Sequence, residues 1–585
     1  MNRRTIPGMW QSGLASRPPD AVAYLVRSGS SWSEVTWGEA ASRVEAMANG
    51  LLARGVGKGE VIAVLAPTTL EWTLFDFALA SVGGVTAPVY FTSSPEDAQY
   101  VVRHAGAIGI LCDTDEQLAK VDGMSQLRKE LTLTYADLER LEEEGRAFSH
   151  ANPHALESVS AAIADDDLYT FIYTSGTTGP PKGCMILHRN YYEMAAVVEK
   201  MPEMLHAGDL ALLYLPMAHN FGRLVSLGGA KIGYTIAFEP NPYAVADALP
   251  AVRPTFFPSV PRVFEKIHTN VAAAFDEATG PKRKLIDWSL RIGYDVAARR
   301  QAGLPIPRSL ARRHRLADRL VYSKVKARLG GRLRLGVSGA APLAQSILEF
   351  FAALDIPIVE AYGLTECTSG ATANRPIAYR HGTVGRALPG FELRLAEDGE
   401  LELRSETVFA GYYKDPEATA AVLSEDGWLR TGDIASIDEE GFVTITDRKK
   451  DILVTAGGKN VAPQNLEVAL KTSRFVSQAI VVGDRRPYIA ALITLDPVEV
   501  ASWAKEQGLT EDVTTLSTSP QAQTLIQGVV DEVNAGRSRF EQIKRFAILP
   551  RDFEMAREEL TPTLKLRRKV VLGHFADEVD RLYAE

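Results

Sequence analysis

Cysteine is scarce in this chain of 585 residues, which contains only Cys112, Cys184 and Cys367. The three are far apart, form no C-x-x-C pair and have no neighbouring histidine cluster, so the sequence predicts neither a disulfide framework nor a zinc site. A reducing cytoplasm fits this usage. Long apolar runs are also absent, because no stretch approaches the roughly 20 apolar residues of a membrane-spanning helix. A composition with 46% hydrophobic and 23% charged residues instead predicts a large protein with more than one packed core.

The spacing of apolar segments predicts an α/β fold for the large N-terminal part of the chain. Apolar runs at 61–65, 85–90 and 108–112 are typical of buried strands. Amphipathic helical stretches near 70–82 and 95–105 lie between them. Alternation of this kind builds doubly wound parallel sheets.

The pattern changes after about residue 390, where short strands separated by turn signals predict a β-rich subdomain over about 390–447. We therefore expect a large N-terminal domain over residues 1–449 and a small mobile α+β domain over residues 450–585. The acidic residues 136–150 are interpreted as a solvated connection.

The most informative feature is the run Tyr-Thr-Ser-Gly-Thr-Thr-Gly-Pro-Pro-Lys-Gly at 173–183, directly after the apolar run 168–172. Its glycines let backbone N–H groups turn toward an anion, its hydroxyls add donors, and Lys182 adds a positive charge. The G-x-x-x-x-G-K-[ST] spacing of a Walker A loop is absent. The run therefore predicts a different kind of polyphosphate loop. Its expected phosphate-binding members are Thr174, Ser175, Gly176, Thr177, Thr178, Gly179 and Lys182.

Further motifs follow along the chain: Val-Ser-Gly-Ala-Ala-Pro at 337–342, Glu-Ala-Tyr-Gly-Leu-Thr-Glu at 360–366, Trp-Leu-Arg-Thr-Gly-Asp at 428–433, Thr-Asp-Arg-Lys-Lys-Asp at 446–451, and Leu-Thr-Pro-Thr-Leu-Lys-Leu-Arg-Arg at 560–568. Together with the run at 173–183, these motifs resemble those of the adenylate-forming superfamily, which includes acyl-CoA synthetases, firefly-luciferase-like enzymes and peptide-synthetase adenylation domains. The resemblance extends over about residues 30–570. It implies that ATP activates a carboxylic acid as an acyl-adenylate with release of pyrophosphate.

The resemblance also implies how the nucleotide is held. Tyr362 stacks on the adenine ring, Asp433 accepts hydrogen bonds from the ribose hydroxyls, and Arg448 contacts ribose and phosphate. The other nucleotide-binding positions implied are Gly339, Ala340, Ala341, Glu360, Ala361 and Gly363.

Charge stabilisation dominates the expected chemistry, because one anion attacks the phosphorus of another. By resemblance, Thr365 hydrogen-bonds the α-phosphate, and Glu366 binds Mg²⁺ together with Thr177. Lys565 matches the family's C-terminal lysine, which bridges the attacking carboxylate and the α-phosphate. Thr365, Glu366 and Lys565 are therefore the expected catalytic residues.

The second half-reaction of the family transfers the acyl group to the thiol of CoA after the C-terminal domain rotates. Lys450 matches the hinge position of that rotation. The segment 451–465, with Gly458 and Lys459, matches the lining of the pantetheine tunnel, where glycine allows close passage of the arm.

Three segments indicate which class of carboxylic acid is the substrate. The stretch 215–223 has no acidic residue that could hold an amino group, which disfavours an amino-acid substrate. The runs 257–266 and 324–331 are similar to those of long-chain fatty acyl-CoA synthetases. His219 is expected at the entrance of the acyl pocket, with Gly363 also on the substrate side.

Several alternatives stay open from the sequence alone. An aryl acid could replace the fatty acid, since pocket depth depends on side chains brought together by folding. A carrier protein supplied in trans could replace CoA as acceptor. A catalytically silent acyl- or AMP-binding regulator is the alternative from outside enzymology. No motif indicates nucleic-acid binding.

One segment differs sharply in charge from the rest. Residues 281–334 contain 16 Lys and Arg against 3 Asp, a local charge of +13 in a chain of net charge −9. Leucine, isoleucine, Trp288 and Tyr294 are interspersed among the basic residues. This pattern favours helices lying on an anionic membrane, with CoA phosphates and a merely solvated helical pair as alternatives.

Overall fold

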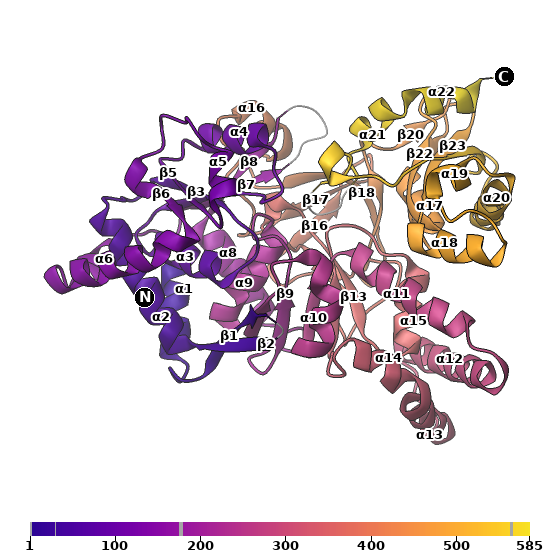
Figure 1. Ribbon diagram of the computed structural model, residues 1–585, viewed down its shortest axis with the longest axis horizontal. Helices are drawn as coiled ribbons and strands as arrows, with labels where there is room; N and C mark the ends of the chain where they lie inside the picture. The colour runs from indigo at the N-terminus through magenta and orange to yellow at the C-terminus, as the bar shows by residue number, and fades with distance from the viewer. Residues whose placement is uncertain (1–2, 30, 175–179, 562–565, 585) are drawn as a thin grey trace.

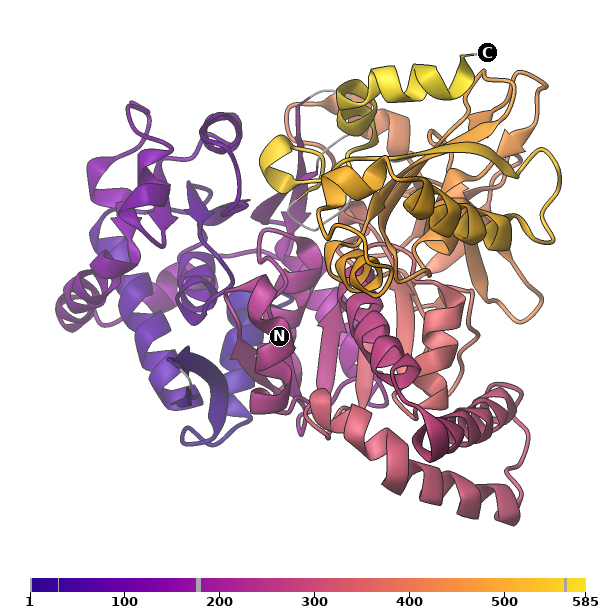
Figure 2. The ribbon, with the colours of Figure 1, turned by 45° about the vertical axis from the view of Figure 1, so that its right-hand side comes forward.

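The computed structural model describes residues 3–29, 31–174, 180–561 and 566–584. Its larger part, coloured from indigo to salmon in Figure 1, holds sheets flanked by helices, and a smaller orange and yellow part lies beside it. The turned view also places the two parts side by side (Figure 2). This arrangement confirms the predicted α/β class with a small α+β unit at the C-terminal end.

The first sheet carries the Gly/Thr-rich run. Its strand order is β6-β5-β3-β4-β7-β8, in which only the β7–β8 pair is antiparallel. β3 and β4 are buried along their whole length, as expected for parallel strands covered on both faces. The strands are β3 (Val61–Leu65), β4 (Val85–Val89), β5 (Gly109–Cys112), β6 (Thr132–Thr134), β7 (Leu168–Thr174) and β8 (Lys182–Leu187).

The second sheet has the order β15-β14-β13-β12-β11-β9-β10-β1-β2. β12 and β13 are parallel neighbours, with Ser338 opposite Glu360. The carboxyl ends of these two strands therefore bring the motifs at 337–342 and 360–366 together. The strands are β1 (Val22–Ser28), β2 (Ser31–Thr36), β9 (Leu210–Leu213), β10 (Thr235–Phe238), β11 (Phe256–Ser259), β12 (Leu335–Ser338), β13 (Ile358–Tyr362), β14 (Thr372–Ala373) and β15 (Arg386–Ala387).

Helices surround both sheets, and within the part of the chain that the structure describes none is long and apolar enough to cross a membrane. Those of the larger part are α1 (Ile6–Ala15), α2 (Trp37–Ala53), α3 (Leu70–Ser81), α4 (Pro95–Ala105), α5 (Asp115–Ala119), α6 (Leu138–Ala151), α7 (Ala155–Ala161), α8 (His188–Glu199), α9 (Asn220–Ile232), α10 (Val245–Val252), α11 (Pro261–Asp276), α12 (Gly280–Gln301), α13 (Arg308–Ala317), α14 (Ser323–Arg328), α15 (Gln345–Ala353) and α16 (Pro416–Val422).

The interpretation of residues 136–150 as a solvated connection is wrong. They form most of α6, whose Leu138 and Leu141 are buried in the main core. The acidic residues are held by arginines: Arg43 Nε lies 3.0 Å from Glu142 Oε1, and Arg54 Nε lies 2.7 Å from Glu144 Oε2. Leu138 and Leu141, at positions i and i+3, give the helix an apolar stripe. Burial of this stripe determines the structure of the segment more than its net charge does.

The strands predicted after residue 390 form one antiparallel sheet, β16-β17-β18-β19, made of β16 (Glu392–Leu395), β17 (Glu400–Arg404), β18 (Leu429–Ile437) and β19 (Val443–Arg448). The C-terminal part has a separate sheet, β22-β23-β24, whose alternate residues face opposite cores. Val481 and Ile493 belong to one apolar cluster, while Ile480 and Leu492 belong to another. Its elements are β20 (Leu453–Val454), β21 (Asn460–Val461), α17 (Pro463–Leu470), β22 (Val476–Val482), β23 (Ile489–Leu495), α18 (Pro497–Glu506), α19 (Val513–Ser517), α20 (Pro520–Asn534), β24 (Ile543–Ile548), α21 (Arg568–His574) and α22 (Ala576–Tyr583).

Polar contacts join α11 to the C-terminal part. Arg262 donates from Nη1 to the Ser477 carbonyl (3.0 Å) and from Nη2 to Ser477 Oγ (2.8 Å). Lys471 Nζ lies 3.3 Å from Glu265 Oε1. These contacts fix the orientation in which the two parts meet.

Candidate active site

The predicted phosphate loop connects β7 to β8. Thr174 and Lys182 are paired at its base. The Lys182 ammonium lies 3.2 Å from Asp415 Oδ2 and 5.1 Å from the centroid of the Tyr412 ring. The base of the hairpin therefore presents a positive charge. The other predicted members of the loop lie outside the described residues: Ser175, Gly176, Thr177, Thr178 and Gly179.

The small-residue turn after β12 is held by a buried carboxyl group on β13. Glu360 Oε1 accepts a hydrogen bond from Leu343 N at 3.1 Å, which fixes the turn that contains Gly339, Ala340 and Ala341. Ala340 has a φ of 72°, a left-handed conformation that costs energy for a residue with a side chain. The turn is thus shaped by its tertiary contacts as well as by its own residues.

Burial raises the pKa of Glu360 to about 7, although the hydrogen bond from Leu343 N lowers it in part. The folded protein consequently binds this proton more tightly than the unfolded chain, in which the pKa is near 4.5. Stability from this group is complete below pH 4.5 and falls as the pH rises to about 7.

We expect Glu360→Gln to remove this pH dependence, because a glutamine oxygen can still accept from Leu343 N. The variant should exceed the wild type in unfolding free energy by on the order of 2–4 kcal/mol at pH 8 and by little at pH 4.5. Urea unfolding at the two pH values checks this. Equal differences at both would contradict the assignment of the proton to Glu360.

Three residues from separate motifs meet where the ends of β13 and β19 lie beside the middle of β18. Tyr362 donates from its hydroxyl to Asp433 Oδ2 at 2.6 Å. Arg448 Nε lies 3.5 Å from Asp433 Oδ1, across the β18–β19 pair. Burial and the neighbouring Asp433 carboxylate hold the pKa of Tyr362 well above its usual value, so the phenol keeps its proton. The predicted adenine, ribose and phosphate contacts therefore come together in space.

Gly363, directly after Tyr362, has no room for a side chain. A Cβ added to Gly363 would lie 1.6 Å from the carbonyl oxygen of Ser369. The chain at 368–370 folds back against Gly363, with Thr368 and Ser369 both at positive φ. Ala361, two residues before Gly363, is half-buried against the main core. The tight return explains why the motif needs glycine at this position.

The Thr365–Glu366 pair lies in a short 3₁₀ turn, η5 (Thr365–Cys367). Thr365 is buried, while Glu366 accepts a hydrogen bond from the Tyr412 hydroxyl at 2.7 Å through Oε1. The backbone carbonyl of Glu366 accepts from Phe409 N at 2.9 Å. Residues 409–412 thus hold Glu366 through its main chain and its side chain.

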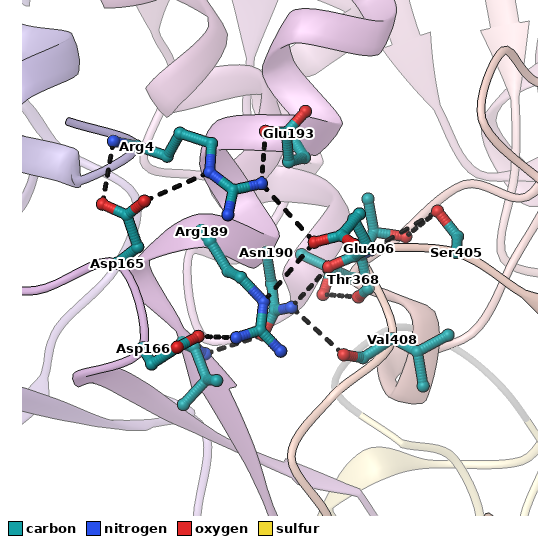
Figure 3. A network of polar contacts seen from close by, with 12 residues as sticks. Arg4, Asp165, Asp166, Arg189, Asn190, Glu193, Thr368, Ser405, Glu406 and Val408 are labelled. Atoms are coloured by element: carbon teal, nitrogen blue, oxygen red, sulfur yellow. Dashed lines mark hydrogen bonds and ion pairs between the residues drawn. The ribbon is translucent and has the colours of Figure 1, made fainter. Parts of the chain in front are cut away.

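A network of polar side chains fixes the segment that leads into residues 409–412 (Figure 3). Buried Asn190 donates from Nδ2 to the carbonyls of Glu406 (2.9 Å) and Val408 (3.1 Å), and Thr368 Oγ1 donates to the Thr407 carbonyl (2.6 Å). Arg4 Nη1 lies 3.5 Å from the Glu406 carboxylate. Arg4, near the N-terminus, and Asn190 of α8 therefore support the segment that holds the Glu366 turn.

Sequence reasoning missed Tyr412 and Asp415. Both lie in the polar turn before α16, where Asp415 also accepts from Ala418 N at 3.0 Å as the cap of that helix. A Gly-Tyr-Tyr-Lys-Asp-Pro string between two apolar elements was the available signal. Only folding shows that Tyr412 lies between Lys182 and Glu366.

His219 lies next to these motifs, immediately before α9. Its Nδ1 accepts from Phe221 N at 3.2 Å, which caps the helix. Asn220 donates from Nδ2 to the Leu364 carbonyl at 3.3 Å. The start of α9 is therefore attached to the 360–366 motif.

The remaining predicted residues belong to the C-terminal part. Lys450 is exposed in the turn between β19 and β20, and Gly458 and Lys459 are exposed in the turn between β20 and β21. Lys565 lies outside the described residues. Its described neighbours Leu560 and Leu566 form an antiparallel bridge. Within the described ranges, Lys459 contacts Thr455 and Phe540, and neither it nor Gly458 forms a hydrogen bond or ion pair with the residues of the nucleotide motifs.

The side chains around Glu366 suit magnesium only if phosphate oxygens of a substrate supply further ligands. No group of three or more His, Cys, Asp or Glu side chains that could hold a metal occurs in the described ranges. Magnesium commonly uses one carboxylate together with the phosphate oxygens of its substrate. Glu366, with one oxygen hydrogen-bonded to a neutral phenol, fits that mode.

Comparisons with known proteins identify the family of this chain. The family model "AMP-binding enzyme" matches residues 13–413, and "AMP-binding enzyme C-terminal domain" matches residues 450–585. Long-chain-fatty-acid–CoA ligase FadD15 of Mycobacterium tuberculosis is 38% identical over 580 residues, covering 97% of this chain and 95% of that protein. Long-chain-fatty-acid–CoA ligase ACSBG2 of Rattus norvegicus is 30% identical, with 99% and 93% covered.

Solved structures share the fold at lower identity. The adenylation domain of a carboxylate reductase from Mycobacterium chelonae has a TM-score of 0.76 at 22% identity, covering 99% of this chain and 91% of that one. The anthranilate CoA ligase AuaEII, in complex with anthranoyl-AMP, has a TM-score of 0.75 at 18% identity, with 98% of both chains covered. With family models matching most of its length and relatives similar from end to end, this chain belongs to the family of AMP-binding enzymes.

Proposed function

We propose that this protein is a fatty acyl-CoA synthetase, an acid–thiol ligase that converts a fatty acid and ATP to acyl-AMP and pyrophosphate and then transfers the acyl group to CoA. The observation that carries the proposal is the end-to-end similarity to long-chain-fatty-acid–CoA ligases, 38% over 97% of the chain. The meeting of Tyr362, Asp433 and Arg448 supports it independently, because these side chains offer one aromatic face, one acceptor pair and one cation to a nucleotide.

Each reacting group has proposed partners in this site. Thr174 and Lys182, with residues 175–179, hold the phosphates, and Glu366 with Thr177 holds Mg²⁺ beside them. Thr365 and Lys565 act at the α-phosphorus, where negative charge gathers in the transition state. A carboxylate is already ionised at neutral pH and needs no general base to attack.

Transfer to CoA requires a second arrangement of the chain, for which we propose residues 1–449 and 450–585 as the moving units and Lys450 as the hinge. Support comes from the apolar cluster that each part has of its own, since only partly buried Val468 of α17 packs from the C-terminal part against the main cluster among the described residues. The polar contacts of Arg262 and Lys471 that join the parts can be exchanged without exposing either core. Gly458 and Lys459, both exposed, are free to line the pantetheine path after rotation.

A carboxylate panel tests the proposed substrate class. Acids from acetate to oleate, together with aromatic acids, are compared by AMP release in the presence of CoA. We expect the largest release with long-chain acids and little with benzoate or anthranilate. A preference for aromatic acids would contradict the proposal that the substrate is a fatty acid. A holo-carrier protein offered in place of CoA distinguishes the two acceptors.

We also propose that the protein binds the surface of an anionic membrane from the cytoplasmic side through α12 and α13. These helices project from the larger part in both views (Figures 1 and 2). Arg308, Arg312 and Arg315 follow one face of α13 at helical spacing and are exposed. Leu316 is 49% exposed beside them, and Leu304, before the helix, is 54% exposed. Cations next to exposed apolar side chains suit an anionic lipid surface.

Liposome co-sedimentation tests this surface. Arg312→Glu with Arg315→Glu is expected to reduce binding to vesicles containing phosphatidylglycerol by tenfold or more, since each basic residue near such a surface contributes about 1 kcal/mol. The matched control, Arg485→Glu with Lys505→Glu, makes the same change of net charge in the C-terminal part. Equal losses for both pairs, or binding that ignores salt and anionic lipid, would refute the assignment.

A further inference from the structure

Tyr412 lies between the cation and the carboxylate that the proposed function assigns to ATP and Mg²⁺. Its hydroxyl donates to Glu366 Oε1 at 2.7 Å, and its ring centroid lies 5.1 Å from Lys182 Nζ. Lys182 begins β8 of the first sheet, whereas Glu366 lies in η5, the 3₁₀ turn that follows β13 of the second sheet. One aromatic side chain therefore contacts both charges.

The ring is fixed by its surroundings. Tyr412 N donates to Thr419 Oγ1 at 2.9 Å, and its backbone forms a bridge with Cys184 on β8. The Phe409 ring packs edge-on at 5.0 Å between centroids. Gly411, before it, has a φ of 126°, and a Cβ there would lie 2.7 Å from Thr419 Cγ2. The position of the phenol is thus determined by backbone contacts on two sides.

The two charged groups that contact the ring, Lys182 and Glu366, differ in their ion-pair partners. Lys182 has a carboxylate partner, Asp415, at 3.2 Å. For Glu366, by contrast, no basic group lies within 4.0 Å among the residues that the structure describes. The ammonium therefore has its counter-ion in Asp415, whereas the contact of the Glu366 carboxylate on this side is the Tyr412 phenol.

We propose that Tyr412 is a positioning residue that orients the Glu366 carboxylate and holds the Lys182 ammonium against its ring. The face of the ring attracts the ammonium, and the hydroxyl engages Oε1. Oε2 of Glu366 stays available for the divalent cation bound to the nucleotide, and phosphate oxygens compete with Asp415 for the ammonium. The inference rests on the proposed function, because Lys182 and Glu366 are assigned to the nucleotide there.

Metal-dependent nucleotide binding tests this role without turnover. The probe is α,β-methylene-ATP with Mn²⁺, measured by calorimetry and by the electron paramagnetic resonance of free Mn²⁺. Tyr412→Phe keeps the ring and loses the hydroxyl, so we expect about tenfold weaker Mn²⁺ binding to the nucleotide complex. Tyr412→Leu loses both contacts and should weaken it further, while also raising the dissociation constant of the metal-free nucleotide. The control Tyr413→Phe, on the opposite side of the backbone against Phe171, should change neither value by more than about twofold.

Two results would overturn the inference in distinguishable ways. Wild-type Mn²⁺ affinity in Tyr412→Phe and Tyr412→Leu, together with a large loss in Glu366→Gln, would show that the metal site exists and that Tyr412 does not position it. Unchanged Mn²⁺ and nucleotide binding in Glu366→Gln and Lys182→Ala would instead reject the assignments of the proposed function, and the role of Tyr412 with them.

Discussion

Replacing Lys565 with alanine is expected to slow formation of the acyl-adenylate by about 10² to 10³, the usual cost of removing a charge placed where the transition state needs it. The reason is the build-up of negative charge when a carboxylate attacks the α-phosphate. Fatty-acid-dependent exchange between ATP and pyrophosphate measures this half-reaction alone. Transfer of a supplied acyl-adenylate to CoA should fall far less, because in the proposed mechanism another face of the C-terminal part serves that step.

Lys569→Ala is the matched control for Lys565→Ala. It removes an exposed lysine from the same basic segment and should leave the exchange rate within about twofold of the wild type. Equal losses in the two variants would mean that the segment acts through its overall charge. An unaffected exchange rate in Lys565→Ala would contradict the assigned role.

The described residues around this segment form a rigid base. Glu559, fully buried, receives two hydrogen bonds from Arg551, each 2.6 Å, and its Oε1 lies 2.9 Å from His574 Nδ1. These partners hold the pKa of Glu559 at about 2, in opposition to the effect of burial. Arg567 N donates to the Glu559 carbonyl at 2.8 Å. Glu559 thus holds Arg551 and His574 through its carboxylate and the main chain at Arg567 through its carbonyl.

The largest expected loss of stability follows from Asp76→Ala. Asp76 is buried on α3, where it forms an ion pair with Arg223 of α9 and accepts hydrogen bonds from Tyr169 (2.5 Å) and Thr86 (2.8 Å). The alanine variant leaves the Arg223 guanidinium buried without its counter-charge, which costs about 3–5 kcal/mol. A fall in the urea midpoint, followed by tryptophan fluorescence, measures the effect.

A double variant and a surface control make this expectation specific. Asp76→Ala with Arg223→Met removes both charges, so it should recover part of the lost stability, because an apolar replacement of a buried pair is often neutral. Glu392→Gln breaks the exposed pair with Arg404 and should leave the midpoint nearly unchanged. A loss in the double variant as large as the sum of the two single losses would contradict a direct charge pair.

Local pattern was enough to predict much of the fold. The strands at 61–65 and 85–90 are β3 and β4, since continuous apolar β-branched runs are buried on both faces of a parallel sheet. The same reasoning failed at 136–150, where charge obscured the apolar stripe of α6. Trp288 shows a second limit: it is half-buried against the core, whereas Tyr294 is exposed as expected. Leu304 and Leu316 are further exposed apolar side chains near the arginines.

The site could be predicted only as a set of separate motifs. The sequence placed Tyr362, Asp433 and Arg448 in three strings, and nothing local shows that they meet within hydrogen-bonding or ion-pair distance. The position of Tyr412 between Lys182 and Glu366 depends on the pairing of β8 with the chain near residue 412. Such contacts are non-local, so neither periodicity nor propensity contains them.

The central claim is that a fatty acid is activated as an adenylate before CoA takes part. Exchange of labelled pyrophosphate into ATP by the wild-type protein, with Mg²⁺ and a long-chain fatty acid but no CoA, tests it most directly. We predict exchange that requires the acid and proceeds without CoA. Exchange that is absent under these conditions, or that appears only when CoA is added, would contradict the account.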